Sequence, residues 1–257
     1  MQHRLHGAGV QGLLLGPSLA AWFVLLLADT WLILPTFCTT SWSSVGDPAA
    51  MDAALRLNSL DAVAAGWMLM VAAMMPPLLA TPLTHIRARS VRTRRARSAG
   101  LFLIAYAGTW AAAGAALLLL ALVLHSLAAV HAAAPGSAAT LLALLWQASP
   151  LKQRALNRCH KLPPLSPSGA AADGDAFAFG LSHGSACVAS CWAMMLIPLA
   201  LPWYAHVPVM VLVAIFAFAE RQEQPRPASW AFRWPVQGLA ASLGLAARSG
   251  SRLILGK

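Results

Sequence analysis

The chain alternates between long apolar runs and short polar segments, and this alternation predicts its secondary structure. Six runs are rich in Leu, Ala, Val and Met, and several exceed the roughly 18 residues that a helix needs to cross a bilayer. They cover residues 12–34, 60–83, 100–124, 138–150, 176–201 and 203–219. We therefore predict an all-α fold, a polytopic membrane helix bundle with about six transmembrane helices.

Composition favours a membrane protein and argues against several other classes. Hydrophobic residues make up 59% of the 257 residues and charged residues only 10%, whereas soluble proteins are about one quarter charged. The net charge of +10 does not indicate nucleic-acid binding, because the positive side chains cluster beside the apolar runs. We expect no cleavable signal peptide and no disulfide framework, although the chain has four Cys.

The positions of Lys and Arg predict the orientation of the helices. Residues 84–98, which we interpret as a loop, carry six arginines, and a second Lys/Arg-rich segment at 151–175 ends in a Pro/Gly/Ser-rich loop at 162–175. We also predict a short polar tail at 1–11 and a polar outer loop at 35–59 that contains Cys38. With both termini in the cytoplasm, only Arg56 of the 18 Lys and Arg lies outside, as the positive-inside rule requires. The sequence thus predicts a multi-pass protein of the bacterial inner membrane, with a transmembrane domain at 1–220. Residues 221–257 mix Trp, Phe and Leu with Arg, which predicts an interfacial amphipathic tail.

Three donor side chains stand four residues apart in the fifth run. His183, Cys187 and Cys191 would lie on one face of a helix. Met194 continues that face, and imidazole, thiol and thioether groups together suit Cu(I) or Zn(II). His183 and Cys191 would be about 12 Å apart along the axis, so they cannot share one ion. Either Cys187 pairs with one neighbour and other helices complete the site, or the donors form a relay, or the face is ordinary core packing.

Two further pairs of donors are predicted to reach the cytoplasmic half of the fifth run. Met74 and Met75 precede Pro76-Pro77, which must disrupt the helix at a packed or cavity-lining position. Cys159 and His160 follow the fourth run, where non-helical backbone would let adjacent residues share an ion. The nearby Lys and Arg could lower the thiol pKa of Cys159. Filling gaps in the core is the alternative role for the methionines.

Three motifs carry a family resemblance across roughly residues 60–220. They are Trp67-Met68…Met74-Met75-Pro76, Gln147…Pro150-Leu151-Lys152…Cys159, and Gly180…His183-Gly184…Cys187…Cys191-Trp192-Ala193-Met194. In these motifs the chain resembles the DUF2182 family of predicted metal-binding integral membrane proteins. The resemblance implies a metal site within the membrane bundle. The chain departs from the family pattern at Ser190, where a second Cys is common, and at Arg221, where Lys is common.

Three functional hypotheses follow from these patterns. The first is an integral membrane protein that holds, delivers or transports a metal ion, with copper preferred to zinc and a metal donor or acceptor protein as partner. Its proposed ligands are His183, Cys187 and Cys191, with Cys159, His160, Met74, Met75 and Met194 as auxiliary donors.

The second hypothesis is a structural or accessory subunit of a larger membrane complex. The third is a thiol redox enzyme that uses Cys187 and Cys191. It ranks last, because two Cys at this helical spacing are poorly oriented for a disulfide and no catalytic set accompanies them.

Overall fold

In the computed structural model of the protein, residues 2–28, 60–130, 135–201 and 203–235 are described. All regular elements in these ranges are helices, so the predicted all-α class is confirmed. The elements are α1 (Gln2–Ala28), α3 (Leu60–Met74), η2 (Pro76–Leu79), α4 (Ala80–Arg89), η3 (Arg92–Arg94), α5 (Arg95–Val130), α6 (Pro135–Ala148), α7 (Pro150–Cys159), α8 (Gly169–Leu199) and α9 (Trp203–Gln222). The predicted loop at 35–59 with Cys38, and most of the predicted C-terminal tail, lie outside these ranges.

Three helical segments are long and apolar enough to cross a membrane, namely Arg92–Leu124, Gly169–Leu199 and Ala205–Gln222. A fourth span is formed if the bent pair Val63–Met74 and Pro76–Arg89 is counted as one. The predicted span at 12–34 corresponds in the described part to a shorter apolar helical stretch, Leu14–Leu27, and the predicted span at 138–150 overlaps the 14-residue helix α6. The count of six spans and the cytoplasmic placement of both termini therefore stay predictions.

The predicted disruption at Pro76-Pro77 is confirmed. The helix α3 ends at Met74, and the chain bends by 57° before it continues. Proline has no backbone N–H, so the first bond after the break is donated by the Leu78 N–H to the carbonyl of Met75, at 3.0 Å. Leu78 and Leu79 are buried, which places the break inside the packed bundle as expected.

Three segments that we interpreted as loops or a tail are helical instead. Residues 2–11 belong to α1, residues 84–98 are divided among α4, η3 and α5, and residues 169–175 open α8. Arginine is a good helix former, so a run of arginines does not by itself terminate a helix. The arginine segment is also held in place by ion pairs, since Arg94 and Arg97 contact Asp173 of α8 at 2.6 and 2.8 Å.

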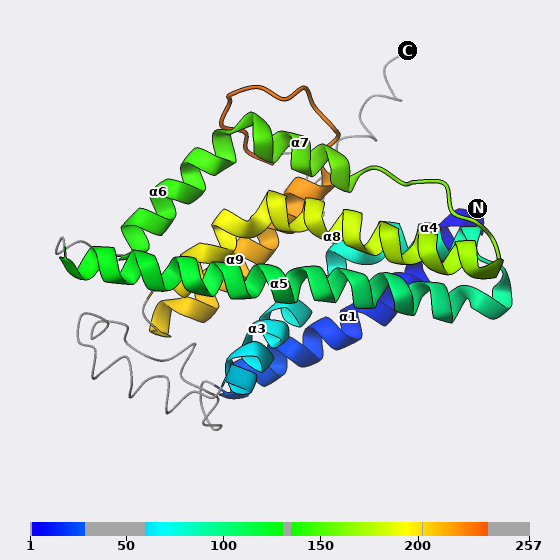
Figure 1. The fold of residues 1–257 in the computed structure, drawn as a ribbon, viewed down its shortest axis with the longest axis horizontal. Coiled ribbons are helices and arrows are strands. Elements are labelled where there is room, and N and C mark those ends of the chain that lie inside the picture. The colour runs from blue at the N-terminus through cyan, green and yellow to red at the C-terminus, as the bar shows by residue number, and fades with distance from the viewer. Residues whose placement is uncertain (1, 29–59, 131–134, 202, 236–257) are drawn as a thin grey trace, which may run out of the picture.

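The centre of the bundle is α8, which packs against α5, α6, α7 and α9. Figure 1 shows α5 and α8 side by side along the long axis of the molecule. Two glycines allow this close approach. A Cβ at Gly180 would lie 2.4 Å from the Phe102 carbonyl oxygen, and one at Gly184 would lie 3.0 Å from the Thr109 side chain. Small residues at such contacts are typical of closely packed membrane helices.

After α9 the chain forms an irregular segment, residues 223–235, which we call the C-terminal strap. It crosses the α6–α7 corner, where the Ala231 N–H donates to the Ala148 carbonyl at 3.0 Å. The Asn157 side-chain amide donates to the Arg226 carbonyl at 2.7 Å. The strap therefore connects the end of α9 to α7. Its aromatic residues Trp230 and Trp234 are exposed, which fits the interfacial role predicted for the tail.

Candidate functional site

The donor face predicted on α8 points into the bundle. His183, Cys187, Cys191 and Met194 are all buried on one continuous helix. Cys187 and Cys191 are one turn apart and interact electrostatically, and the Ser190 hydroxyl lies 3.4 Å from the Cys191 sulfur. The two thiols are thus buried neighbours on one helix face, and we call them the α8 thiol pair.

Two side chains from other helices reach this pair. The Tyr106 hydroxyl of α5 donates a hydrogen bond to the Cys187 sulfur at 3.2 Å. The Arg221 guanidinium of α9 donates to the same sulfur through Nη2, at 3.5 Å. Both donors stabilise negative charge on the sulfur, and a thiolate is the form of Cys that binds metal ions. The surroundings of Cys187 therefore favour the ligand form.

Cys159 joins the thiols from α7. Its side chain is buried and interacts electrostatically with Arg221 and Cys191. Burial raises the pKa of the Cys159 thiol, and the positive charge of Arg221 only partly opposes this shift. The lowered pKa that we considered from the sequence is therefore wrong, because the buried position outweighs the nearby positive charges.

The prediction of non-helical backbone at Cys159 and His160 is also wrong. Cys159 is the last residue of α7, and His160 is its C-cap with φ −87° and ψ −7°, a helical conformation. Burial and the charge of Arg221 lower the pKa of the half-buried His160, whose Nε2 has no hydrogen-bond partner. His160 also interacts electrostatically with His183, so α7 and α8 bring both histidines to the same region.

His183 lies in an aromatic environment next to the thiols. Its ring centroid is 5.9 Å from that of Phe102, 6.2 Å from Tyr106 and 5.7 Å from Phe179. Both of its ring nitrogens are buried and lack a hydrogen-bond partner. Buried polar atoms are nearly always satisfied, so an unpartnered imidazole one turn from the Cys187 thiol fits a residue that binds a ligand.

The candidate methionines belong to the core that also contains the three thiols. Met74, Met75 and Met194 are buried there, and Met74 and Met75 flank the break between α3 and η2. Core membership fits both roles that the sequence left open, packing and sulfur donation.

Within the described residues, no group of three or more His, Cys, Asp or Glu side chains is arranged to hold a metal ion. The structure therefore brings together a pair, Cys187 and Cys191, with Cys159 and His183 near it, rather than a complete coordination shell.

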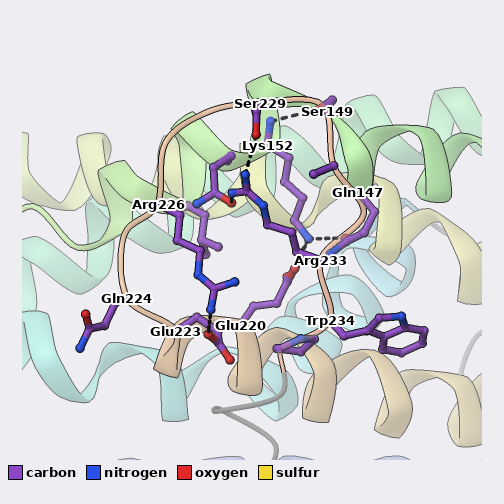
Figure 2. Close-up of a pocket in the computed structure, with 14 residues that line it drawn as sticks. Gln147, Ser149, Lys152, Glu220, Glu223, Gln224, Arg226, Ser229, Arg233 and Trp234 are labelled. Atoms are coloured by element: carbon purple, nitrogen blue, oxygen red, sulfur yellow. Dashed lines mark hydrogen bonds and ion pairs between the residues drawn. The ribbon is translucent and has the colours of Figure 1, made fainter.

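A buried polar network beside the thiols was not foreseen. Lys152 of α7 forms an ion pair with Glu220 of α9 at 2.5 Å, and Gln147 hydrogen-bonds with both. Burial lowers the pKa of Lys152, whereas the negative charge of Glu220 opposes this shift. A cavity of about 30 Å³ lies next to the network, large enough for water. Figure 2 shows Gln147, Lys152 and Glu220 beneath the C-terminal strap.

The sequence did contain a signal for this network and for Arg221. Glu220 and Arg221 end an apolar helix, and ionisable residues within membrane helices are usually buried and paired. From the sequence we noted Arg221 only as a departure from the family pattern. Tyr106 gave no comparable signal, because its approach to Cys187 depends on the packing of α5 against α8.

Comparison with known proteins gives a family match. A family model described as "PpoB2: Copper chaperone" matches residues 64–245, a range that contains every candidate donor as well as Tyr106 and Arg221. No curated protein and no solved structure matches the chain at a significant level. The match supports the copper-related character that we inferred, but its description is not that of the DUF2182 family.

Proposed function

The chain belongs to the PpoB2 copper chaperone family, and from this membership we propose that it is an integral membrane protein that binds Cu(I) and passes it to another protein. The α8 thiol pair is the proposed binding site. Cys159 and His183 are the proposed neighbours that receive or release the ion. Copper is the cargo of this process.

The observation that carries the proposal is the surroundings of Cys187. This sulfur is completely buried, interacts electrostatically with a second thiol, and accepts hydrogen bonds from Tyr106 and Arg221. Soft thiolates prefer Cu(I) among the ions available to a cell, and a buried sulfur is protected from water and oxidants. A neutral core position would not need two hydrogen-bond donors directed at one sulfur.

Membrane location is the second part of the proposal. Three helices of the described chain have the length and apolar composition of membrane spans, and many of their large apolar side chains are exposed. Exposed apolar surface of this extent is typical of contact with lipid. Fractionation of cells that express the protein, followed by extraction with carbonate or detergent, tests this location. Release by carbonate alone would contradict it.

The binding site is tested by measuring copper per chain after loading with Cu(I) under reducing conditions. We expect Cys187→Ser to lose copper, because a hydroxyl is a poor ligand for a soft ion. Cys191→Ser and His183→Ala are expected to weaken retention. Cys38→Ser is the matched control, since it removes a thiol that the sequence places across the membrane from the site.

If Cys187→Ser retains as much copper as Cys38→Ser, the α8 thiol pair is core packing. The accessory-subunit hypothesis would then account better for the buried thiols, and copper binding would have to be sought elsewhere in the chain.

A further inference from the structure

A single arginine lies among the thiols. The Nε and Nη1 atoms of Arg221 are buried and have no hydrogen-bond partner, while Nη2 donates to the Cys187 sulfur. The guanidinium interacts electrostatically with Cys159, Cys187, Cys191 and Tyr106. Arginine stays protonated at all physiological pH values, so this site contains a fixed positive charge.

No carboxylate of the described residues neutralises this charge. The adjacent acid, Glu220, pairs instead with Lys152 at 2.5 Å. Glu223 pairs with Arg226 at 2.7 Å. The titratable groups that interact with Arg221 are three thiols, a phenol and the imidazoles of His160 and His183, and of these only the thiols become negative when they bind a metal ion.

Because the charge of Arg221 is fixed, the net charge of the loaded site depends on the valence of the bound ion. Two thiolates with one Cu(I) carry one net negative charge, and the guanidinium brings the buried site to neutrality. Two thiolates with one Zn(II) are already neutral, so the guanidinium leaves one uncompensated positive charge. Uncompensated charge in a buried, low-dielectric site is strongly unfavourable.

From this arrangement we infer that Arg221 makes the α8 thiol pair selective for a soft monovalent ion over a divalent one. The inference rests on the proposed function, because it assumes that the pair binds metal. Arg221 is then a specificity-determining residue that acts by its charge and by two unused donor nitrogens, Nε and Nη1. It does not need to contact the ion.

The test compares affinities for Cu(I) and Zn(II) in the full-length protein, purified into lipid nanodiscs. Competition with a chromophoric Cu(I) chelator under reductant measures the first affinity, and competition with a Zn(II) indicator measures the second. We expect Arg221→Met to lower the ratio of Cu(I) to Zn(II) affinity by roughly tenfold or more, because one full charge near the ion is removed. Arg221→Lys should have a ratio of Cu(I) to Zn(II) affinity close to that of the wild type.

The matched control is Arg154→Met, which removes an exposed arginine from α7 and should leave the ratio unchanged. Helix content by circular dichroism and size-exclusion behaviour show whether each variant is folded. If Arg221→Met does not fold, Arg221→Lys and Arg221→Gln provide the comparison between charged and neutral side chains.

The outcomes separate the two proposals. Wild-type protein that binds no Cu(I) contradicts the proposed function itself. If the wild-type protein binds Cu(I) and a folded neutral variant keeps the wild-type ratio of Cu(I) to Zn(II) affinity, only the role of Arg221 is contradicted. The inference is supported if the ratio of Cu(I) to Zn(II) affinity falls in the neutral variants and is retained in Arg221→Lys.

Discussion

Replacing Gly180 with alanine should separate α5 from α8 and so disturb the thiol site from a distance. A Cβ at this position would lie 2.4 Å from the Phe102 carbonyl oxygen and 2.8 Å from the Ala105 Cβ. Non-bonded heavy atoms are most favourable at about 3.5–4.0 Å, so the helices must move apart locally by roughly 1 Å. The contact atom on α5 is backbone, which cannot rotate away as a side chain would.

The expected magnitude follows from the kind of contact. Overpacking a tight core contact by one methyl group destabilises proteins by about 1–3 kcal/mol. For a chain of this size such a loss lowers the melting temperature by roughly 3–10 °C. Tyr106 lies one turn beyond Phe102 on α5, so its 3.2 Å hydrogen bond to Cys187 should lengthen as well. We therefore expect weaker Cu(I) retention together with the lower melting temperature.

The assay is thermal unfolding of the purified protein in detergent, with copper retention measured on the same samples. Gly174→Ala is the matched control, because Gly174 lies on the same helix and has no atoms within 4 Å of its added Cβ. Alanine is the better helix former, so the control should be neutral or slightly more stable. Equal melting temperatures for the two variants would refute the reasoning that Gly180 sets the distance between α5 and α8.

Two further predictions concern the polar side chains of α7. Lys152→Met should lower the free energy of unfolding by about 3–5 kcal/mol, because it leaves Glu220 buried without its partner. In thermal unfolding, the double variant Lys152→Met/Glu220→Gln should recover stability. The exposed control Lys161→Met should unfold like the wild type. Since the pKa of His160 is lowered from 6.5 by burial and by Arg221, its contribution to stability is present above pH 6.5 and lost as the pH falls towards the folded-state pKa. His160→Gln should therefore reduce the acid sensitivity of unfolding between pH 7 and roughly 5, and an unchanged pH profile would contradict this account of His160.

Features that depend on one helix could be predicted from the sequence. The buried donor face of α8 follows from the spacing of four residues, and the bend at Pro76 follows from the missing N–H of proline. Local chemistry alone determines both features. The thiol pair was therefore identifiable before any helix had been placed relative to another.

Features that depend on contacts between helices could not be predicted in the same way. Tyr106 and Arg221 come from α5 and α9, and their approach to Cys187 depends on how both helices pack against α8. The sequence correctly placed Cys159 near the donor face of α8. It wrongly predicted a non-helical backbone at Cys159 and a lowered thiol pKa. The sequence shows nearby positive charges, whereas the extent of burial depends on the tertiary structure.

The complete burial of the Cys187 sulfur has a consequence for the speed of metal transfer. A ligand-exchange step requires an incoming sulfur to reach the ion, and no incoming group can reach an atom that is wholly covered. In the proposed function, loading and release must therefore pass through a less populated, locally opened state. The observed exchange rate is then the intrinsic rate multiplied by the fraction of open molecules. A partner protein that stabilises the open state would accelerate delivery without changing the affinity of the closed site for copper.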